Sequence, residues 1–372
     1  MQQENIVIIG GGLAGLTAAI HLSKNGKQVT VIEKNSYPRH KVCGEYISNE
    51  VLPYFKSLDL DIDSLHPTKI TDLHFSTCTG KSLKLKLPLG GFGISRYILD
   101  EYLYTKAIEN GCKFIFDQVS AINFIDDIFE IKTNNHGTFN SKIALGAFGK
   151  RSNIDIALQR KFISRKSNWL AVKAHYFGDF DNNLVGLHNF SGGYCGISKV
   201  ENDRVNVCYI TNHLLFKTYK SIAEFQNRIV YENPFLKHFF ETSTMIFDKP
   251  LTISQISFNK KHLTENHILM IGDSAGLIHP LCGNGMAMAI RSAKIASELI
   301  DKYFQNKIES RYYLEKTYCK QWNHNFRKRL FFGQTISNIL QKPKLATFLI
   351  RIFIKIPNVV FVIVKNTHGK PF

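Results

Sequence analysis

The chain has 372 residues, of which 44% are hydrophobic and 12% aromatic. A chain of this composition can bury a sizeable core, which excludes disordered and collagen-like proteins. Lys and Arg number 47 against 30 Asp and Glu, for a formal net charge of +17. Fourteen of these cations but only two acids lie in residues 302–372, so this segment carries +12 of the +17.

An apolar run near the start of the chain, residues 6–9, leads directly into a glycine-rich GxGxxG sequence. A short β-branched run of this kind is typical of a buried parallel strand. Gly10 permits a tight turn, Gly12 lets the backbone approach a pyrophosphate, and Gly15 allows close packing of the next helix. The N-terminus of that helix is expected to hold the phosphates.

A second strand is expected at residues 29–32, and it ends at Glu33. An acid at this distance from a GxGxxG loop is expected to bind a ribose 2′-hydroxyl. Strand, glycine loop, helix, strand and acid therefore occur in the order of a Rossmann-like dinucleotide-binding unit.

The middle of the chain has the period-two pattern of half-buried strands. Strands are expected at 73–76 and 82–87, and a hairpin is expected from 193–200 and 204–210 with its turn at 201–203. These segments predict an antiparallel sheet inserted into the nucleotide-binding unit.

A second glycine-rich motif follows another buried apolar run at residues 268–271. It leads into a helix that is expected to run through residues 286–295. The motif and the start of this helix contain Gly272, Asp273, Pro280, Gly283, Asn284, Gly285 and Met286.

The pair of motifs resembles the p-hydroxybenzoate hydroxylase-like superfamily of FAD-dependent oxidoreductases, which includes monooxygenases, halogenases and geranylgeranyl reductases. The resemblance implies an α/β fold: a Rossmann-like FAD-binding domain of the glutathione-reductase type, an inserted antiparallel substrate sheet and a C-terminal helical tail. The implied FAD-binding domain comprises residues 1–64, 96–159 and 256–300. The implied substrate domain comprises 65–95 and 160–255, and the basic tail comprises 301–372.

The resemblance also implies non-covalent FAD and the residues that hold it. Asp273 matches an Asp that binds the ribityl chain, and the segment around Cys43 resembles a loop that runs beside the flavin. Arg96 opens a helical stretch through residue 110 and matches an arginine at the FAD phosphates; otherwise it is a solvated helix-start residue. The implied cofactor-binding residues are Gly10, Gly12, Leu13, Ala14, Gly15, Glu33, Lys34, Lys41, Cys43, Arg96, Gly272, Asp273, Pro280, Gly283, Asn284, Gly285 and Met286.

Three absences narrow the chemistry. A second strand–GxGxxG–helix unit is missing, so a separate pyridine-nucleotide domain is not expected. The family's middle motif, which often holds an Asp and serves both FAD and NAD(P)H, has Leu145 at that place. The expected electron source is therefore NAD(P)H or a partner reductase. The halogenase WxWxIP signature is also missing.

The reaction is left with three alternatives. A flavin monooxygenase acting on an apolar substrate, possibly linked to a lipid or a carrier, is the first. An alkene reductase similar to geranylgeranyl reductases is the second, and a non-catalytic electron-relay flavoprotein is the third.

Four residues are expected near the flavin ring. His279 is either an acid or base near neutral pH or a loop histidine with a backbone hydrogen bond. Cys282 is either a packing residue or a proton donor. Glu45 orients substrate, stays neutral beside the ring, or pairs with Lys41 or Arg39. Cys43 is the fourth candidate.

Seven dispersed cysteines form no CxxC pair and no zinc-like cluster with His, which is typical of free thiols in a reducing compartment. No metal site is expected. The N-terminal sequence lacks the pattern of a signal peptide, so a cytoplasmic protein is expected. Basic residues and a proline interrupt the apolar segment 345–364, which disfavours a spanning helix but leaves peripheral attachment open.

The basic tail has two interpretations. It is a helical cap whose basic face is solvated, or it docks against an anionic membrane or an acidic carrier protein. Nucleic acid is not an expected partner, because no nucleic-acid-binding signature accompanies the charge.

Overall fold

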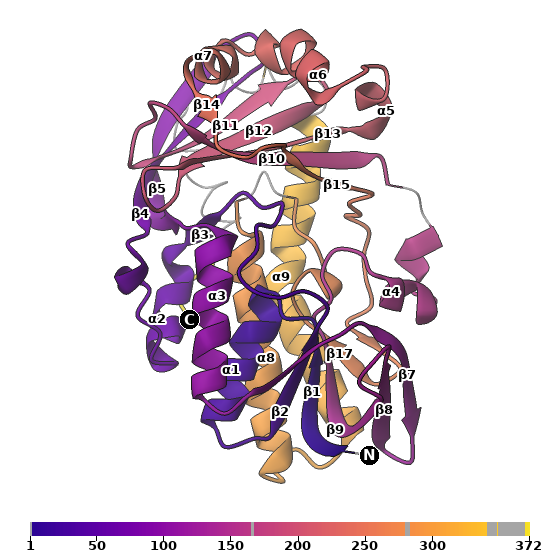
Figure 1. The fold of residues 1–372 in the computed structure, drawn as a ribbon. Coiled ribbons are helices and arrows are strands. Elements are labelled where there is room, and N and C mark those ends of the chain that lie inside the picture. Colours follow the sequence, from indigo (N-terminus) through magenta and orange to yellow (C-terminus); the bar gives the residue numbers. More distant parts are fainter. Residues whose placement is uncertain (1, 165–166, 280–282, 341–347, 349–368) are drawn as a thin grey trace.

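The computed structural model describes residues 2–164, 167–279, 283–340, 348 and 369–372. Two β-sheets dominate the fold, one at the top of Figure 1 and one at the lower right. The long helices lie below the upper sheet and beside the lower one. The protein is therefore a mixed α/β fold with two multi-stranded sheets and a C-terminal helix.

The first sheet is built around four neighbouring parallel strand pairs in the order β17-β9-β1-β2-β6. Its central side chains, such as Ile6, Ile8 and Val31, are fully buried, as expected for strands covered on both faces. β8 pairs with β9 and with β7, both antiparallel, and the short strand β16 pairs with β17 at the edge of the sheet. The strands are β1 (Gln2–Ile9), β2 (Val29–Glu33), β6 (Lys113–Phe116), β7 (Val119–Ile125), β8 (Ile128–Thr133), β9 (Thr138–Gly146), β16 (Thr264–Glu265) and β17 (Ile268–Met270).

Helix α1 packs between α3 and α8, and α8 packs against the long C-terminal helix α9 (Figure 1). The side chain of Ser95 accepts a hydrogen bond from Ile98 N and fixes the start of α3. The helices of this layer are α1 (Leu13–Lys24), α2 (Leu52–Ser57), α3 (Arg96–Glu109), α4 (Asn153–Ala157), α8 (Gly285–Phe304) and α9 (Arg311–Leu340).

The second sheet has nine strands, with the order β14-β10-β13-β12-β11-β4-β5-β3 and β15 beside β10. All its pairs are antiparallel except β11–β4. The strands are β3 (Tyr46–Ser48), β4 (Thr68–Ser76), β5 (Ser82–Gly93), β10 (Trp169–Phe177), β11 (Leu184–Phe190), β12 (Gly193–Lys199), β13 (Val205–Asn212), β14 (Thr244–Met245) and β15 (Leu251–Ser254).

Three short helices cover the outer face of the second sheet (Figure 1). Their buried residues Phe225, Leu236 and Phe239 pack with apolar side chains of β10, β12 and β13 in a separate core. The other face of the sheet is thereby left for the layer below. The covering helices are α5 (His213–Phe216), α6 (Ile222–Arg228) and α7 (Pro234–Thr242).

The predicted β12–β13 hairpin and the strand pair β4–β5 are confirmed. Residues 46–48, which the sequence groups with the FAD-binding domain, pair with β5 in the second sheet, because the chain crosses to that sheet directly after Glu45. Helix α8 spans Gly285–Phe304 and so contains the predicted helical stretch 286–295. The apolar segment 345–364 lies outside the described residues, and no described helix has the length and hydropathy to cross a membrane.

Candidate functional site

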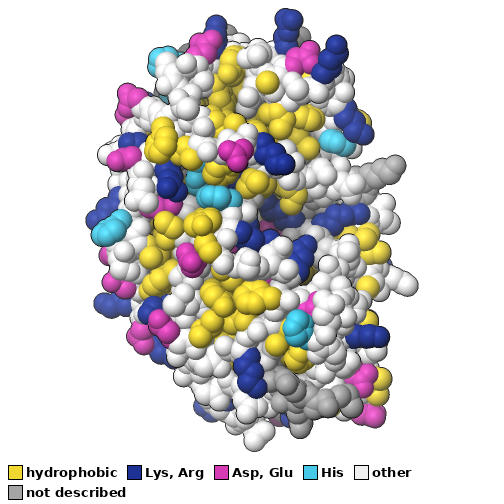
Figure 2. All heavy atoms as spheres, viewed as in Figure 1, with side chains coloured by type: hydrophobic (Ala, Val, Ile, Leu, Met, Phe, Trp, Pro, Cys, Tyr) yellow, Lys and Arg dark blue, Asp and Glu magenta, His cyan; other side chains and the backbone are white. Residues whose placement is uncertain are grey.

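A cavity of about 720 Å³ lies between the two sheets. Its floor includes Ile9, Glu33, Ala147 and Ile271, at or just beyond the carboxyl ends of parallel strands. This is where open α/β sheets bind ligands. Figure 2 shows a hollow in the surface with Lys and Arg side chains along its edge.

The glycine loop forms one end of the cavity and has room for a phosphate. A Cβ atom at Gly12 would meet no atom within 4 Å, and Gly12 lines the cavity. At Gly10, where φ is +106°, a Cβ would lie 2.4 Å from the Ala147 carbonyl oxygen. At Gly15 it would lie 2.0 Å from the Gly10 carbonyl oxygen. Gly10 and Gly15 thus leave no room for a side chain, and an open cradle remains beside Gly12 at the N-terminus of α1, where the sequence predicts the phosphates.

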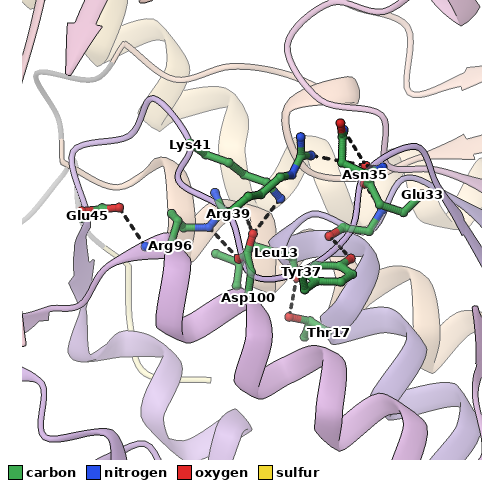
Figure 3. Close-up of polar contacts among 11 residues, drawn as sticks. Leu13, Thr17, Glu33, Asn35, Tyr37, Arg39, Lys41, Glu45, Arg96 and Asp100 are labelled. Atoms are coloured by element: carbon green, nitrogen blue, oxygen red, sulfur yellow. Dashed lines mark hydrogen bonds and ion pairs between the residues drawn. The ribbon is translucent and has the colours of Figure 1, made fainter. Parts of the chain in front are cut away.

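Glu33 is fixed at the end of β2 by backbone donors (Figure 3). Its Oε2 accepts from Gly11 N at 2.8 Å, and its Oε1 accepts from Asn35 N at 3.1 Å. Arg39 Nη2 lies 3.3 Å from Oε1, and the Tyr37 hydroxyl donates to the Gly11 carbonyl at 2.5 Å. Glu33 is 6% exposed and lines the cavity at the end of β2, where the sequence predicts a ribose contact.

Arg96 and Lys41 converge on the buried carboxylate of Asp100 (Figure 3). Arg96 Nε and Nη2 each lie 2.7 Å from an Asp100 oxygen, and Lys41 Nζ also lies 2.7 Å away. Burial opposes ionisation of Asp100, but the two cations outweigh it and lower the pKa of this carboxyl. Cys43 lies close to Arg96 at the same wall of the cavity. Arg96 is therefore a paired, largely buried group at the cavity wall and not a solvated helix-start residue.

Glu45 lies at the cavity wall with its carboxylate fully paired. Its Oε1 accepts from Arg96 N at 2.8 Å and from Lys173 Nζ at 2.5 Å, and its Oε2 lies 2.7 Å from His175 Nε2. Burial acts to raise the pKa of Glu45, but Lys173 and His175 outweigh it and lower the pKa to about 2. The expected pairing with Lys41 or Arg39 is therefore wrong, because the side-chain partners of Glu45 come from β10, and the lowered pKa opposes the neutral form that was also expected.

The second glycine motif borders the cavity beside the start of α1. Gly272 has φ of +60°, and a Cβ there would lie 2.8 Å from Ala14 Cβ. The side chain of Lys261 donates to the carbonyls of Asp273 and Lys150 at 2.7 and 2.9 Å, which ties this turn to the segment after β9. Asp273 lines the cavity, as expected for a ribityl contact.

Most of the predicted cofactor and catalytic residues gather at this one cavity. Gly15 does not line it but packs against its glycine loop, and Asn284 lies at the N-cap of α8. Pro280 and Cys282 lie outside the described residues. The predicted residues that line the cavity are Gly10, Gly12, Leu13, Ala14, Glu33, Lys34, Lys41, Cys43, Glu45, Arg96, Gly272, Asp273, Gly283, Gly285 and Met286.

His279 is buried beside the second sheet rather than at the cavity wall. It is 5% exposed, and its ring contacts those of Trp169, Tyr194 and Phe258 at centroid distances of 5.8, 5.6 and 4.7 Å. Neither ring nitrogen has a hydrogen-bond partner among the described residues. Burial lowers the pKa of His279 to about 4, so the ring is neutral at pH 7.

This burial predicts acid sensitivity. Below pH 6.5 the unfolded chain protonates His279, whereas the folded chain does so only near pH 4. The stability that the neutral ring provides is therefore present above pH 6.5 and is lost between pH 6.5 and 4, by about 3 kcal/mol. His279→Phe is expected to remove this part of the loss in urea unfolding measured across that range. Parallel pH profiles for the two proteins would contradict the prediction.

Several residues at or next to the cavity wall carried no motif that identified them. Lys173 and His175 occupy alternate positions of a strand whose other members are mostly apolar, and this is the one signal that the sequence offers for them. Lys150 and Arg151 line the cavity shortly after the end of β9, near the place where the family's middle motif has an Asp. His40 also lines it, and burial together with the Lys173 charge lowers the pKa of His40 to about 4.

The wall that the second sheet contributes has a different character. The cavity-lining residues from β4, β5, β10–β13 and β15 include no charged side chain and are mostly aliphatic. The cavity is thus polar and charged near the glycine loop and apolar under the second sheet. These roof residues are Leu73, Leu87, Ala171, Val185, Leu187, Tyr194, Gly196, Ile197, Ser198, Cys208, Tyr209, Ile210, Thr252 and Ile253.

Comparisons with known proteins agree with this arrangement. The DAO family of FAD-dependent oxidoreductases matches residues 5–42. The digeranylgeranylglycerophospholipid reductase of Methanococcus vannielii is 23% identical over 356 residues, which cover 92% of this chain and 87% of the relative.

Two solved structures share the fold. A geranylgeranyl bacteriochlorophyll reductase-like protein from Thermoplasma acidophilum has a TM-score of 0.76 at 20% identity, covering 92% of this chain and 88% of its own. The p-nitrophenol 4-monooxygenase of Pseudomonas putida has a TM-score of 0.80 at 14% identity, covering all of both chains. The family match over residues 5–42, the shared fold and a cavity with an open glycine cradle agree with the FAD-dependent oxidoreductase that the sequence predicts.

Proposed function

We propose that this protein reduces carbon–carbon double bonds in a long apolar chain, such as the isoprenoid chain of a lipid. The observation that carries the proposal is the uncharged, mostly aliphatic roof over a cavity whose other end is charged. Such a roof favours a hydrocarbon through burial of apolar surface and penalises a polar substrate. The relative from Methanococcus vannielii, a reductase of this kind by name, supports the same choice.

The residues fit the FAD that this chemistry needs. The Gly12 cradle and the N-terminus of α1 would hold the phosphates, Glu33 the ribose, and Asp273 the ribityl chain. The order of the parallel strands fits the glutathione-reductase type of FAD-binding domain. The chemistry that reduced FAD would supply here is hydride transfer to one carbon of the double bond, while the other carbon would take a proton from water at the charged end of the cavity. The roof residues orient the chain and exclude water from the reacting carbons.

Hydroxylation, the first alternative from the sequence, is the second candidate. A cavity that excludes water also suits oxygen chemistry, because water exposure favours side reactions of reduced flavin. Yet the described roof offers no carboxylate or lysine to activate an aromatic ring, which favours reduction.

Two further expectations stay predictions. The electron source is NAD(P)H or a partner reductase. The basic tail contacts an anionic membrane or an acidic carrier protein, and the exposure of Arg327, Lys328 and Phe331 on α9 is compatible with such a contact.

The test separates the two reactions by product and by oxygen requirement. The purified protein, with FAD identified by its visible spectrum, is reduced anaerobically with dithionite and mixed with a phospholipid that carries unsaturated isoprenoid chains. Reoxidation of the flavin without oxygen and a gain of two hydrogens per double bond are expected. A flavin that stays reduced until air is admitted, with a product heavier by one oxygen, would replace reduction by hydroxylation.

The roof itself predicts a substitution with a selective effect. Leu187→Asp would place a carboxylate against the hydrocarbon, so the KM for the lipid is expected to rise about 100-fold while FAD absorbance is unchanged. Leu187→Met is the matched control and is expected to behave like the natural protein. Equal KM values for the Asp and Met variants would place the substrate elsewhere.

A further inference from the structure

We propose that Lys173 and His175 are positioning residues that hold the segment 39–45 against the cavity through the Glu45 carboxylate. The two side chains leave the same face of β10, and both are fully buried. Glu45 lies directly before β3, at the far end of the same sheet in the strand order from β10. The contact therefore joins the roof of the cavity to the segment that carries Lys41 and Cys43 along its wall.

The carboxylate of Glu45 has the complete set of donors that a buried anion requires. Lys173 supplies the compensating charge, His175 contacts the second oxygen, and Arg96 N at the start of α3 adds a backbone bond. A buried charge without such partners would cost several kcal/mol. Glu45 also has φ of +54°, a left-handed conformation that surrounding contacts must enforce. The three bonds fix this residue in one orientation.

A second contact from the roof acts on the same segment. Asn206 lies opposite His175 in the β10–β13 register, and its Nδ2 donates to the carbonyls of Gly44 and Cys43 at 2.9 and 3.3 Å. Adjacent strands thus hold the segment by the Glu45 side chain and by its backbone. Such support from rigid strands keeps a site in its productive geometry.

The inference concerns how the wall is held, so it applies whichever substrate the flavin serves. Glu45 is ionised throughout the physiological range, which makes it a structural anion rather than an acid that exchanges protons. Lys173 and His175 do not line the cavity themselves. They act through Glu45, and their loss is expected to loosen residues 39–46 without removing any cofactor contact of the glycine loop.

The test measures the segment directly in the FAD-bound protein. Lys173→Met is expected to raise amide hydrogen exchange in residues 39–46 at least about 10-fold and to change the visible circular dichroism of bound FAD. His175→Gln keeps an N–H near Glu45 and is expected to show a smaller change of the same kind. Arg311→Met is the matched control, because Arg311 is also a buried cation paired with a carboxylate, Asp127, but lies away from the cavity.

A double variant separates positioning from general stability. Lys173→Met combined with Glu45→Gln leaves no unpaired charge, so its thermal midpoint is expected to recover relative to Lys173→Met alone. Exchange in 39–46 and the flavin dichroism are expected to stay altered. The proposal would be overturned if Lys173→Met had the same amide exchange in 39–46 and the same flavin dichroism as the natural protein. It would also be overturned if both measurements returned to the natural values in the double variant. Because neither readout uses substrate, failure here is distinct from failure of the proposed reductase activity.

Discussion

Gly12→Asp is expected to abolish FAD binding while leaving the fold intact. The new side chain would enter the open space beside the cavity, where a Cβ meets no atom within 4 Å, so packing is not disturbed. Its carboxylate would occupy the place that the helix N-terminus offers to a pyrophosphate and would repel that anion. The dissociation constant for FAD is expected to rise at least about 100-fold, or ~2.7 kcal/mol.

Flavin fluorescence titration of the apoprotein measures this change, and urea unfolding of the apoprotein checks the fold. Asn134→Asp, at an exposed position in a turn, makes the same change of charge and is expected to leave both measurements unchanged. If Gly12→Asp retains natural FAD affinity, the phosphates bind elsewhere. If its apoprotein unfolds at lower urea, the effect on FAD is a loss of fold.

Asp100→Asn is expected to have the largest effect on stability, about 3–5 kcal/mol. The substitution keeps the shape of the side chain but leaves Arg96 and Lys41 in a buried site without their shared anion. Burial already lowers the pKa of Lys41, and Asp100 is what opposes that effect. The amide cannot compensate two cations, so the wall of the cavity beside Cys43 is expected to loosen as well.

Urea unfolding at pH 7 with and without FAD measures the loss. Asp181→Asn serves as the matched control, because Asp181 forms an exposed pair with Lys84 at 3.7 Å, and it is expected to change stability by less than about 0.5 kcal/mol. The lowered pKa of Asp100 also fixes the pH dependence. Its contribution is present above the unfolded pKa and is lost as pH falls through the folded value. Similar stabilities for Asp100→Asn and Asp181→Asn would contradict the role of Asp100 as the shared anion of Arg96 and Lys41.

The parts of the site that depend on local sequence were predictable. The glycine loop, Glu33 and the Gly272–Asp273 turn each follow a buried strand, and the carboxyl ends of parallel strands bring them to one edge. The spacing of these residues along the chain is enough to indicate which group each would bind. The open space at Gly12 was expected from the same glycine spacing.

The partners of buried charges were not predictable. Glu45 and Lys173 are separated by 128 residues, and nothing near either one specifies the other. Neighbouring Arg39 and Lys41 were the natural candidates by sequence distance, yet they pair with Glu33 and Asp100. The same holds for His279, whose position in a flavin-motif loop suggested a reactive group, although aromatic rings from other segments bury it. The second sheet contributes to the burial of these side chains. A single sequence does not reveal which side chains that sheet covers.

The second sheet takes its strands from two separated stretches of the chain. β3, β4 and β5 precede α3, and β10 to β15 follow β9, yet β4 and β11 lie side by side. The roof is therefore not encoded by one continuous segment of the gene. A chimaera that exchanges substrate preference between relatives must transplant both stretches together, with the Glu45 partners included. The two stretches are expected to diverge as one unit during evolution.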